Sequence, residues 1–131
     1  MNAVIDASAA VEYLLKTDIG LRVAEVLRGS KLLAPELLDA EVLSVLRHAT
    51  LAKRLKERRA QQAIEDLRDW RVDRVRHRDL LAEAWSLRAR VSAYDAFYVA
   101  LAQSRRATLV TADGPLARAS ALRIAVHNVR A

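Results

Sequence analysis

Short apolar runs alternate with longer amphipathic segments along the whole chain, and this alternation limits the possible folds more than any other feature. Apolar runs at 2–5, 31–35, 71–75, 107–111 and 124–129 have the length of strands, and apolar residues between them recur at helical spacing. Strands joined by helices pair in parallel through right-handed crossovers. The sequence therefore predicts an α/β fold, a three-layer α/β/α sandwich with a mainly parallel sheet of about five strands.

The predicted helices occupy most of the remaining chain. Ser8 is a candidate N-cap for the first helix, and Pro35 suits the first turn of the third. Trp70 and Trp85 fit the apolar stripes of their helices, which favours core packing over stacking on bases. A chain of 131 residues has the usual length of one compact domain, so we expect a single domain over 1–131. Helices are expected at about 8–16, 21–27, 38–49, 57–70, 79–91, 92–106 and 115–122.

The charge balance is basic, with 22 Lys and Arg against 16 Asp and Glu and a formal net charge of +6. This balance favours a polyanionic partner such as a nucleic acid, although an arginine-rich solvated surface gives the same composition. The chain has no cysteine, which excludes disulfides and thiolate zinc sites, although a catalytic metal could still be held by oxygen ligands. We expect no membrane association and a cytoplasmic location, because neither a secretory signal nor a long apolar span is apparent.

Four acidic residues lie where charge is costly. Asp6 ends the first predicted strand and Asp113 follows the fourth, and the carboxyl ends of parallel strands meet at one rim of the sheet. Asp95 interrupts the apolar stretch AYDAFYVALA, and Glu41 adjoins a leucine-rich helical stripe. Each has a structural alternative, since Asp6 or Asp95 could cap a helix, Asp113 could set a turn and Glu41 could face solvent.

Carboxylates gathered on one rim would repel one another. Two unit charges about 4 Å apart at an effective dielectric near 20 interact by roughly 4 kcal/mol, so the group requires a compensating cation. Oxygen ligands favour Mg²⁺ or Mn²⁺, which can activate water and stabilise charge during phosphodiester hydrolysis. Ser8 and Thr111 could orient a carboxylate from the second coordination shell, or could serve only as a helix cap and a strand former.

The motifs together resemble those of a PIN domain, and particularly the toxin ribonucleases of VapBC toxin–antitoxin pairs. The matching segments are VIDASAAVEYLL, PELLDAEVLSVLR, SAYDAFYVALA and TLVTADGPLA, in family order over nearly the whole chain. The resemblance implies a Mg²⁺- or Mn²⁺-dependent endoribonuclease toxin, an RNA substrate, a homodimer and a cognate VapB-type antitoxin. It also implies a catalytic and metal-binding quartet, assisted by Ser8 and Thr111, that consists of Asp6, Glu41, Asp95 and Asp113.

A basic segment follows the helix that carries Glu41. Its side chains could guide RNA phosphates toward the metal, or could simply form a solvated helix with acidic neighbours. The candidate RNA-binding residues are Arg47, Lys53, Arg54 and Arg58. Three histidines, His48, His77 and His127, lack ligand spacing and are expected to have surface or packing roles.

Two other functions are compatible with the same residues. One is a non-catalytic α/β module that binds metal and nucleic acid, and the other is a nuclease of the same chemistry that acts on DNA. Tyr94, Phe97 and Tyr98 adjoin Asp95 and could contact either the core or a partner, so the sequence assigns them no role.

Overall fold

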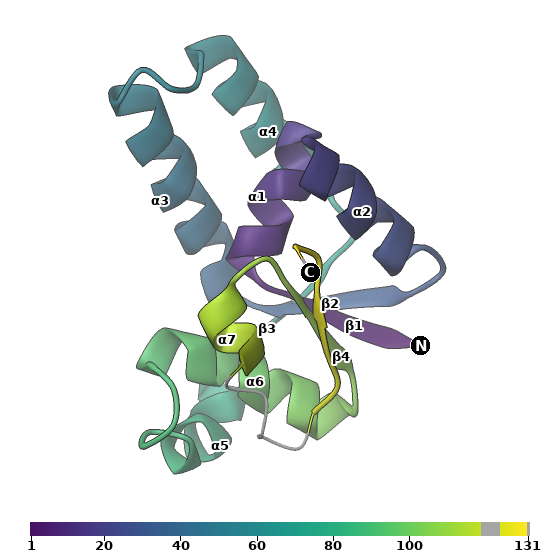
Figure 1. The fold of residues 1–131 in the computed structure, drawn as a ribbon. Coiled ribbons are helices and arrows are strands. Elements are labelled where there is room, and N and C mark those ends of the chain that lie inside the picture. Colours follow the sequence, from purple (N-terminus) through teal and green to yellow (C-terminus); the bar gives the residue numbers. More distant parts are fainter. Residues whose placement is uncertain (119–123, 131) are drawn as a thin grey trace.

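A computed structural model describes residues 1–118 and 124–130 of the chain. Its centre is a five-stranded sheet in the order β3-β2-β1-β4-β5, and every neighbouring pair is parallel. This confirms the predicted sheet and places β1 and β4 side by side at its middle (Figure 1). The strands are β1 (Asn2–Ile5), β2 (Lys31–Pro35), β3 (Asp73–Val75), β4 (Thr108–Thr111) and β5 (Val126–Asn128).

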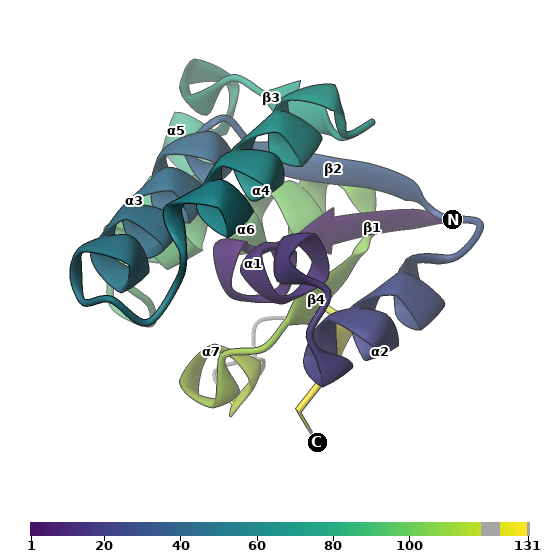
Figure 2. The ribbon, with the colours of Figure 1, turned by 90° about the horizontal axis from the view of Figure 1, so that it is seen from above.

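Helices cover both faces of the sheet, as expected for a three-layer sandwich. Helices α1, α2, α3 and α4 lie on one face and α5, α6 and α7 on the other (Figures 1 and 2). The helices are α1 (Ala7–Leu15), α2 (Asp18–Leu27), α3 (Leu37–Leu51), α4 (Glu57–Asp69), α5 (Leu81–Ser86), α6 (Ala93–Arg105) and α7 (Gly114–Arg118), with a 3₁₀ turn at His77–Leu80 before α5.

The core is divided by the sheet, because successive strand residues point to opposite faces. On β1, Ala3 and Ile5 pack with the α1–α4 layer, whereas Val4 packs with the α5–α6 layer. All three are buried, and so are Leu109 and Val110 of the adjacent β4. A strand buried on both faces reads as a continuous apolar run, which is why β1 and β4 were recognisable in the sequence.

Helices α3 and α4 form an antiparallel pair that projects beyond the sheet (Figure 1). The base of α3 is anchored by Leu38, Val42 and Leu46, which are all buried in the α1–α4 layer. Helix α4 packs back through Ala63 and Leu67. The loop between the two helices therefore lies at the tip of an arm, away from the central strands.

Several local predictions were wrong. The helix expected over 79–91 ends at Ser86, and the chain turns before α6 begins at Ala93. The buried positions of this segment are Leu80, Ala84 and Leu87, so little apolar surface remains to hold a longer helix against the core. Trp85 lies on the outer side of α5 with 69% of its surface exposed, so the expected core packing is not found. The helix expected over 115–122 is seen as Gly114–Arg118, and its remaining residues lie outside the described part.

Pro35 and Ser8 also have positions other than those expected. Pro35 is the last residue of β2 rather than part of a helix, where it is buried and in register with Val75 of β3. The strand end tolerates proline, and helix α3 begins only at Leu37. Asp6, not Ser8, caps α1 by accepting a hydrogen bond from the Ala9 N–H.

The packing expected for Trp70 is confirmed, and two histidines lie at the surface. Trp70 is half-buried and stacks on Tyr13, with ring centroids 4.6 Å apart. His48 and His127 are exposed. Among residues 1–118 and 124–130, no helix is both long and apolar enough to cross a membrane.

Candidate functional site

The four predicted acidic residues come together around one hollow of about 720 Å³. Asp6 lies between β1 and α1, and Asp113 follows β4, so the two adjacent central strands deliver them to the same edge. Glu41 is contributed by α3, and Asp95 by the first turn of α6. The structure thus places side chains from four separate elements at the carboxyl edge of the sheet, where α/β folds bind their ligands.

Hydrogen bonds hold Asp6 in one orientation. Its Oδ1 accepts from the Ser8 hydroxyl at 2.7 Å and from the Ala9 N–H at 3.0 Å, and its Oδ2 accepts from the Thr111 hydroxyl at 2.5 Å. The same hydroxyl oxygens accept backbone N–H groups, Ser8 from Ala112 and Thr111 from Asp113, each at 2.9 Å. Ser8 and Thr111 therefore connect the ends of β1 and β4 through Asp6. Each carboxylate oxygen can accept about two bonds, and among the described residues only the Thr111 hydroxyl donates to Oδ2, which leaves Oδ2 a free position.

Burial makes the charge on Asp6 costly. Only 5% of the residue is exposed, and desolvation raises the pKa of its carboxyl from 3.8 to about 6. The three hydrogen bonds oppose this rise, and the charge of Asp113 adds to it. A buried carboxylate whose pKa is raised near neutrality typifies a functional site, because a merely structural carboxylate usually gains a cationic partner.

The other acidic residues influence one another in the same way. Desolvation raises the pKa of Asp95, and the charge of Asp113 raises it further. Desolvation likewise raises the pKa of Glu41, opposed by a hydrogen bond from Tyr98 and assisted by the charge of Asp95. Asp113 thus repels both Asp6 and Asp95, and Asp95 repels Glu41. A cation bound in the hollow would reduce all three repulsions.

The donor set fits a hard divalent cation. The acidic side chains supply oxygen ligands only, and Mg²⁺ commonly binds through one or two carboxylates while keeping water and substrate oxygens as further ligands. Within residues 1–118 and 124–130, no group of three acidic or histidine side chains stands ready to enclose an ion. The lining therefore matches Mg²⁺ or Mn²⁺ in the chemistry of its donor atoms, without forming a closed cage of ligands among the described residues.

Tyr98, Glu36 and His77 also line this hollow, and the sequence assigned none of them a part in the site. Tyr98 is buried, and its hydroxyl donates to Glu41 Oε1 at 2.7 Å. Glu36 follows β2 just as Asp6 follows β1, so the position after a strand could have identified it. His77 accepts the Leu37 N–H through Nε2 at 2.9 Å and packs against Phe97, which agrees with the expected packing role.

The candidate RNA-binding residues lie along the projecting arm. Arg47 is on α3, Lys53 and Arg54 are in the loop at its tip, and Arg58 is on α4. All four are exposed, and none forms an ion pair with any described residue. With a rise of 1.5 Å per residue, Arg47 lies roughly 9 Å and the end of α3 at Leu51 roughly 15 Å along the helix from Glu41. The arm therefore offers unpaired positive charge leading away from the acidic hollow.

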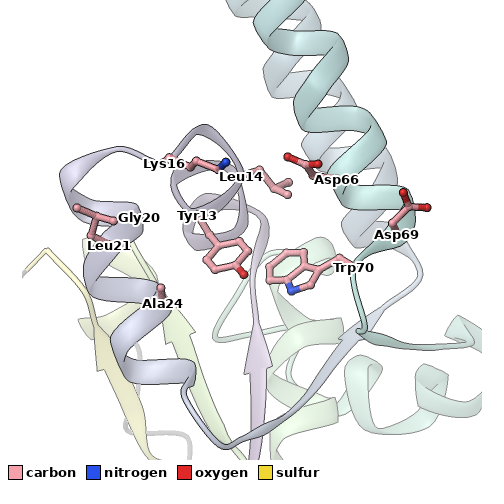
Figure 3. Close-up of a pocket in the computed structure, with 9 residues that line it drawn as sticks. All are labelled: Tyr13, Leu14, Lys16, Gly20, Leu21, Ala24, Asp66, Asp69 and Trp70. Carbon is pink, nitrogen blue, oxygen red and sulfur yellow. The ribbon is translucent and has the colours of Figure 1, made fainter.

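A second hollow, of about 490 Å³, lies between α2 and α4 at the far end of α1 (Figure 3). Its wall includes the stacked rings of Tyr13 and Trp70. Its two carboxylates already have partners on α4, because Asp66 accepts from Gln62 and Asp69 pairs with Arg68.

Comparison with known proteins agrees with this geometry. The model of the PIN domain family matches residues 3–122. The chain is 39% identical over 131 residues to Ribonuclease VapC1 of Mycobacterium tuberculosis, covering 98% of each chain. Two crystal structures share the fold. One is Mycobacterium tuberculosis VapC20, titled a sarcin–ricin loop cleaving toxin, with a TM-score of 0.67 and 18% identity over 91% of this chain and 95% of that one.

The other is VapBC2 from Rickettsia felis, bound to a DNA fragment from its promoter, with a TM-score of 0.62 and 17% identity over 98% of each chain. At these identities the solved structures establish the fold, whereas the family match and the curated relative establish descent. The fold, the placement of the acidic residues and these matches agree: the chain belongs to the PIN domain family and is a relative of the VapC ribonucleases.

Proposed function

We propose that the chain is a divalent-metal-dependent endoribonuclease, the toxin of a VapBC-type toxin–antitoxin pair, and that the acidic hollow is its catalytic centre. The observation that carries this proposal is the convergence of Asp6, Glu41, Asp95 and Asp113 from four elements onto one hollow, in a PIN domain. Mg²⁺ or Mn²⁺ is the proposed cofactor, since both prefer oxygen ligands.

The chain's own residues have distinct tasks in this proposal. Asp6 offers its free Oδ2 position to the metal, while Ser8 and Thr111 hold the carboxylate in place. Glu41, Asp95 and Asp113 complete the acidic lining and favour the binding of positive charge. A bound divalent cation supplies positive charge that offsets the substrate phosphate and the charge that develops during hydrolysis. Without that cation, the acidic lining would repel the phosphate backbone.

The basic arm supports RNA as the substrate. Arg47, Lys53, Arg54 and Arg58 are exposed and unpaired among the described residues, so they remain available to phosphates. The curated relatives are named ribonucleases, and VapC20 is described as a sarcin–ricin loop cleaving toxin. We propose that the arm guides RNA toward the hollow and that the acidic residues lining the hollow, with their bound metal, cleave it.

We propose two partners besides RNA. A cognate VapB-type antitoxin would neutralise the enzyme, by analogy with the VapBC2 assembly of Rickettsia felis. A second copy of the chain would form a homodimer, and the exposed apolar side chains of Leu81 and Trp85 on α5 offer one surface for it. Light scattering of the purified chain, with and without the neighbouring gene product, measures both assemblies.

One assay tests the function. The purified chain is incubated with structured RNAs and with DNA, in EDTA, Mg²⁺ or Mn²⁺, beside Asp6→Asn, Asp95→Asn and the control Asp18→Asn. Asp18 is exposed and lies outside the hollow, so its variant should retain activity. We expect metal-dependent cleavage of RNA that both hollow variants lose. Cleavage that persists in EDTA or in both variants contradicts the mechanism, and preferential cleavage of DNA reassigns the substrate.

A further inference from the structure

Tyr98 is buried, yet its hydroxyl reaches the acidic hollow. The residue lies on α6 and is only 1% exposed, with its ring in the core layer formed by α5 and α6. Its hydroxyl donates to Glu41 Oε1 at 2.7 Å, and Glu41 belongs to α3. Both side chains line the hollow that contains Asp6 and Asp95. A phenol anchored in the core therefore touches one member of the acidic cluster.

The geometry joins two of the proposed metal-binding residues. Tyr98 follows Asp95 by three positions on α6, so both lie on the same side of that helix. Asp95 and the acceptor of the Tyr98 hydroxyl, Glu41, come from different helices on opposite faces of the sheet. The hydrogen bond fixes the glutamate of α3 relative to the aspartate of α6. A long glutamate side chain that is partly exposed would otherwise sample several rotamers.

The hydroxyl remains a donor throughout the physiological range. Desolvation first, and then the hydrogen bond and the charge of Glu41, raise the pKa of Tyr98 far above its ordinary value. A buried phenol needs an acceptor, and a carboxylate that accepts one hydrogen bond still has lone pairs for a cation. The pairing therefore satisfies Tyr98 without exhausting the ligand capacity of Glu41.

We propose that Tyr98 is a positioning residue that holds Glu41 in the orientation required to bind the divalent cation. This inference rests on the proposed function, because it takes Glu41 as a metal-binding residue. Tyr98 itself contacts neither the metal nor RNA in this proposal. Its effect passes through one hydrogen bond, so removing that bond should weaken metal binding without removing any ligand.

The test measures Mn²⁺ affinity by calorimetry on Tyr98→Phe, which keeps the ring and removes only the hydroxyl. We expect the dissociation constant to rise about tenfold, as for other groups that orient metal ligands. Tyr13→Phe is the matched control, because Tyr13 packs on Trp70 in the second hollow, and its Mn²⁺ affinity should equal that of the wild type. A purely structural role for Tyr98 would lower the melting temperature and leave the Mn²⁺ affinity unchanged, which would overturn the inference.

A double-mutant cycle with Glu41→Ala separates this inference from the proposed function. In the Glu41→Ala background, adding Tyr98→Phe should change Mn²⁺ affinity by less than about twofold, since the two act through one bond. A full tenfold effect in that background refutes action through Glu41. If Glu41→Ala alone leaves Mn²⁺ affinity unchanged, the assignment of Glu41 to the metal site is itself refuted, and this inference with it.

Glu41→Asp provides a second route if Tyr98→Phe does not fold. This variant keeps the negative charge but shortens the side chain by one methylene, which draws the carboxylate away from the Tyr98 hydroxyl. Its Mn²⁺ affinity should fall at least as much as that expected for Tyr98→Phe. An affinity equal to that of the wild type would overturn the inference.

Discussion

Replacing Asp6 by asparagine should stabilise the metal-free protein at neutral pH while abolishing its activity. Burial raises the pKa of this carboxyl from 3.8 to about 6. The folded protein therefore prefers the protonated form, and ionisation at pH 7 opposes folding. A shift of roughly two pKa units at 1.36 kcal/mol each corresponds to about 3 kcal/mol of destabilisation from the ionised group.

The pH dependence has a definite sign. Below pH 3.8 the carboxyl is protonated in both the folded and the unfolded chain, so it carries no penalty. Between pH 3.8 and about 6 the unfolded chain loses its proton while folded Asp6 keeps it, and the free energy of unfolding falls as pH rises. Above pH 6 the penalty is complete. The advantage of Asp6→Asn should thus grow across this window.

Asparagine preserves most of the local bonds. Its Oδ1 can accept from the Ser8 hydroxyl and the Ala9 N–H, as Asp6 does. Its NH₂ group replaces the oxygen that faces Thr111, and the lost bond costs about 1 kcal/mol. The net gain at pH 7.5 is therefore about 2 kcal/mol, or roughly 7 °C in melting temperature for a domain of this size.

Thermal melts in EDTA between pH 4.5 and 8 measure this difference, provided that unfolding is reversible. The control Asp18→Asn alters an exposed carboxylate and should show no advantage that grows with pH. A constant difference between Asp6→Asn and the wild type across the window would refute the reasoning, and so would a variant that is less stable at pH 8 than at pH 4.5 relative to the wild type.

Three further predictions concern the metal, the hydrogen bonds and the arm. At a hundredfold excess over its dissociation constant, Mn²⁺ should stabilise the wild type by about 2.7 kcal/mol and leave the stability of Asp6→Asn unchanged. Thermal melts with and without the ion measure this, and equal stabilisation of both proteins excludes Asp6 as a ligand. Thr111→Val removes a buried donor and should lower the free energy of unfolding in urea by about 1–3 kcal/mol. The control Thr108→Val, in the same strand, should lower it less, and an equal loss in both variants would show that the bond to Asp6 is unimportant. Charge reversal at Arg54 and Arg58 should weaken RNA binding and lower its salt slope by about one per lost phosphate contact, and an unchanged slope excludes the arm from the RNA path.

The strands and two of the acidic residues were predictable from the sequence for a physical reason. Buried parallel strands are apolar on both faces, so a charged residue directly after one stands out, as Asp6 and Asp113 do. Glu41 and Asp95 lie within helices, where the sequence does not reveal which elements will meet. Their placement depended on family resemblance until the fold brought α3 and α6 to one edge of the sheet.

Other features could not be read locally. Tyr98 looks like any core aromatic in the sequence, and its partner Glu41 is 57 positions away. Glu36 directly follows the predicted strand 31–35 as Asp6 follows the first strand, but expecting Pro35 in the first turn of the next helix placed Glu36 inside that helix. Trp85 was misplaced because the buried side of this segment is formed by Leu80, Ala84 and Leu87, which leaves Trp85 on the exposed side of α5.

The hydrogen bond from the Thr111 hydroxyl to Asp6 joins residues 105 positions apart in the chain. During synthesis, Asp6 leaves the ribosome before β4, the strand that places Thr111 and Asp113 beside it. A nascent or truncated chain that lacks Thr108–Thr111 has neither the central strand pairing nor the second half of the acidic cluster. The acidic cluster therefore cannot assemble until the chain has been made at least as far as β4 and Asp113.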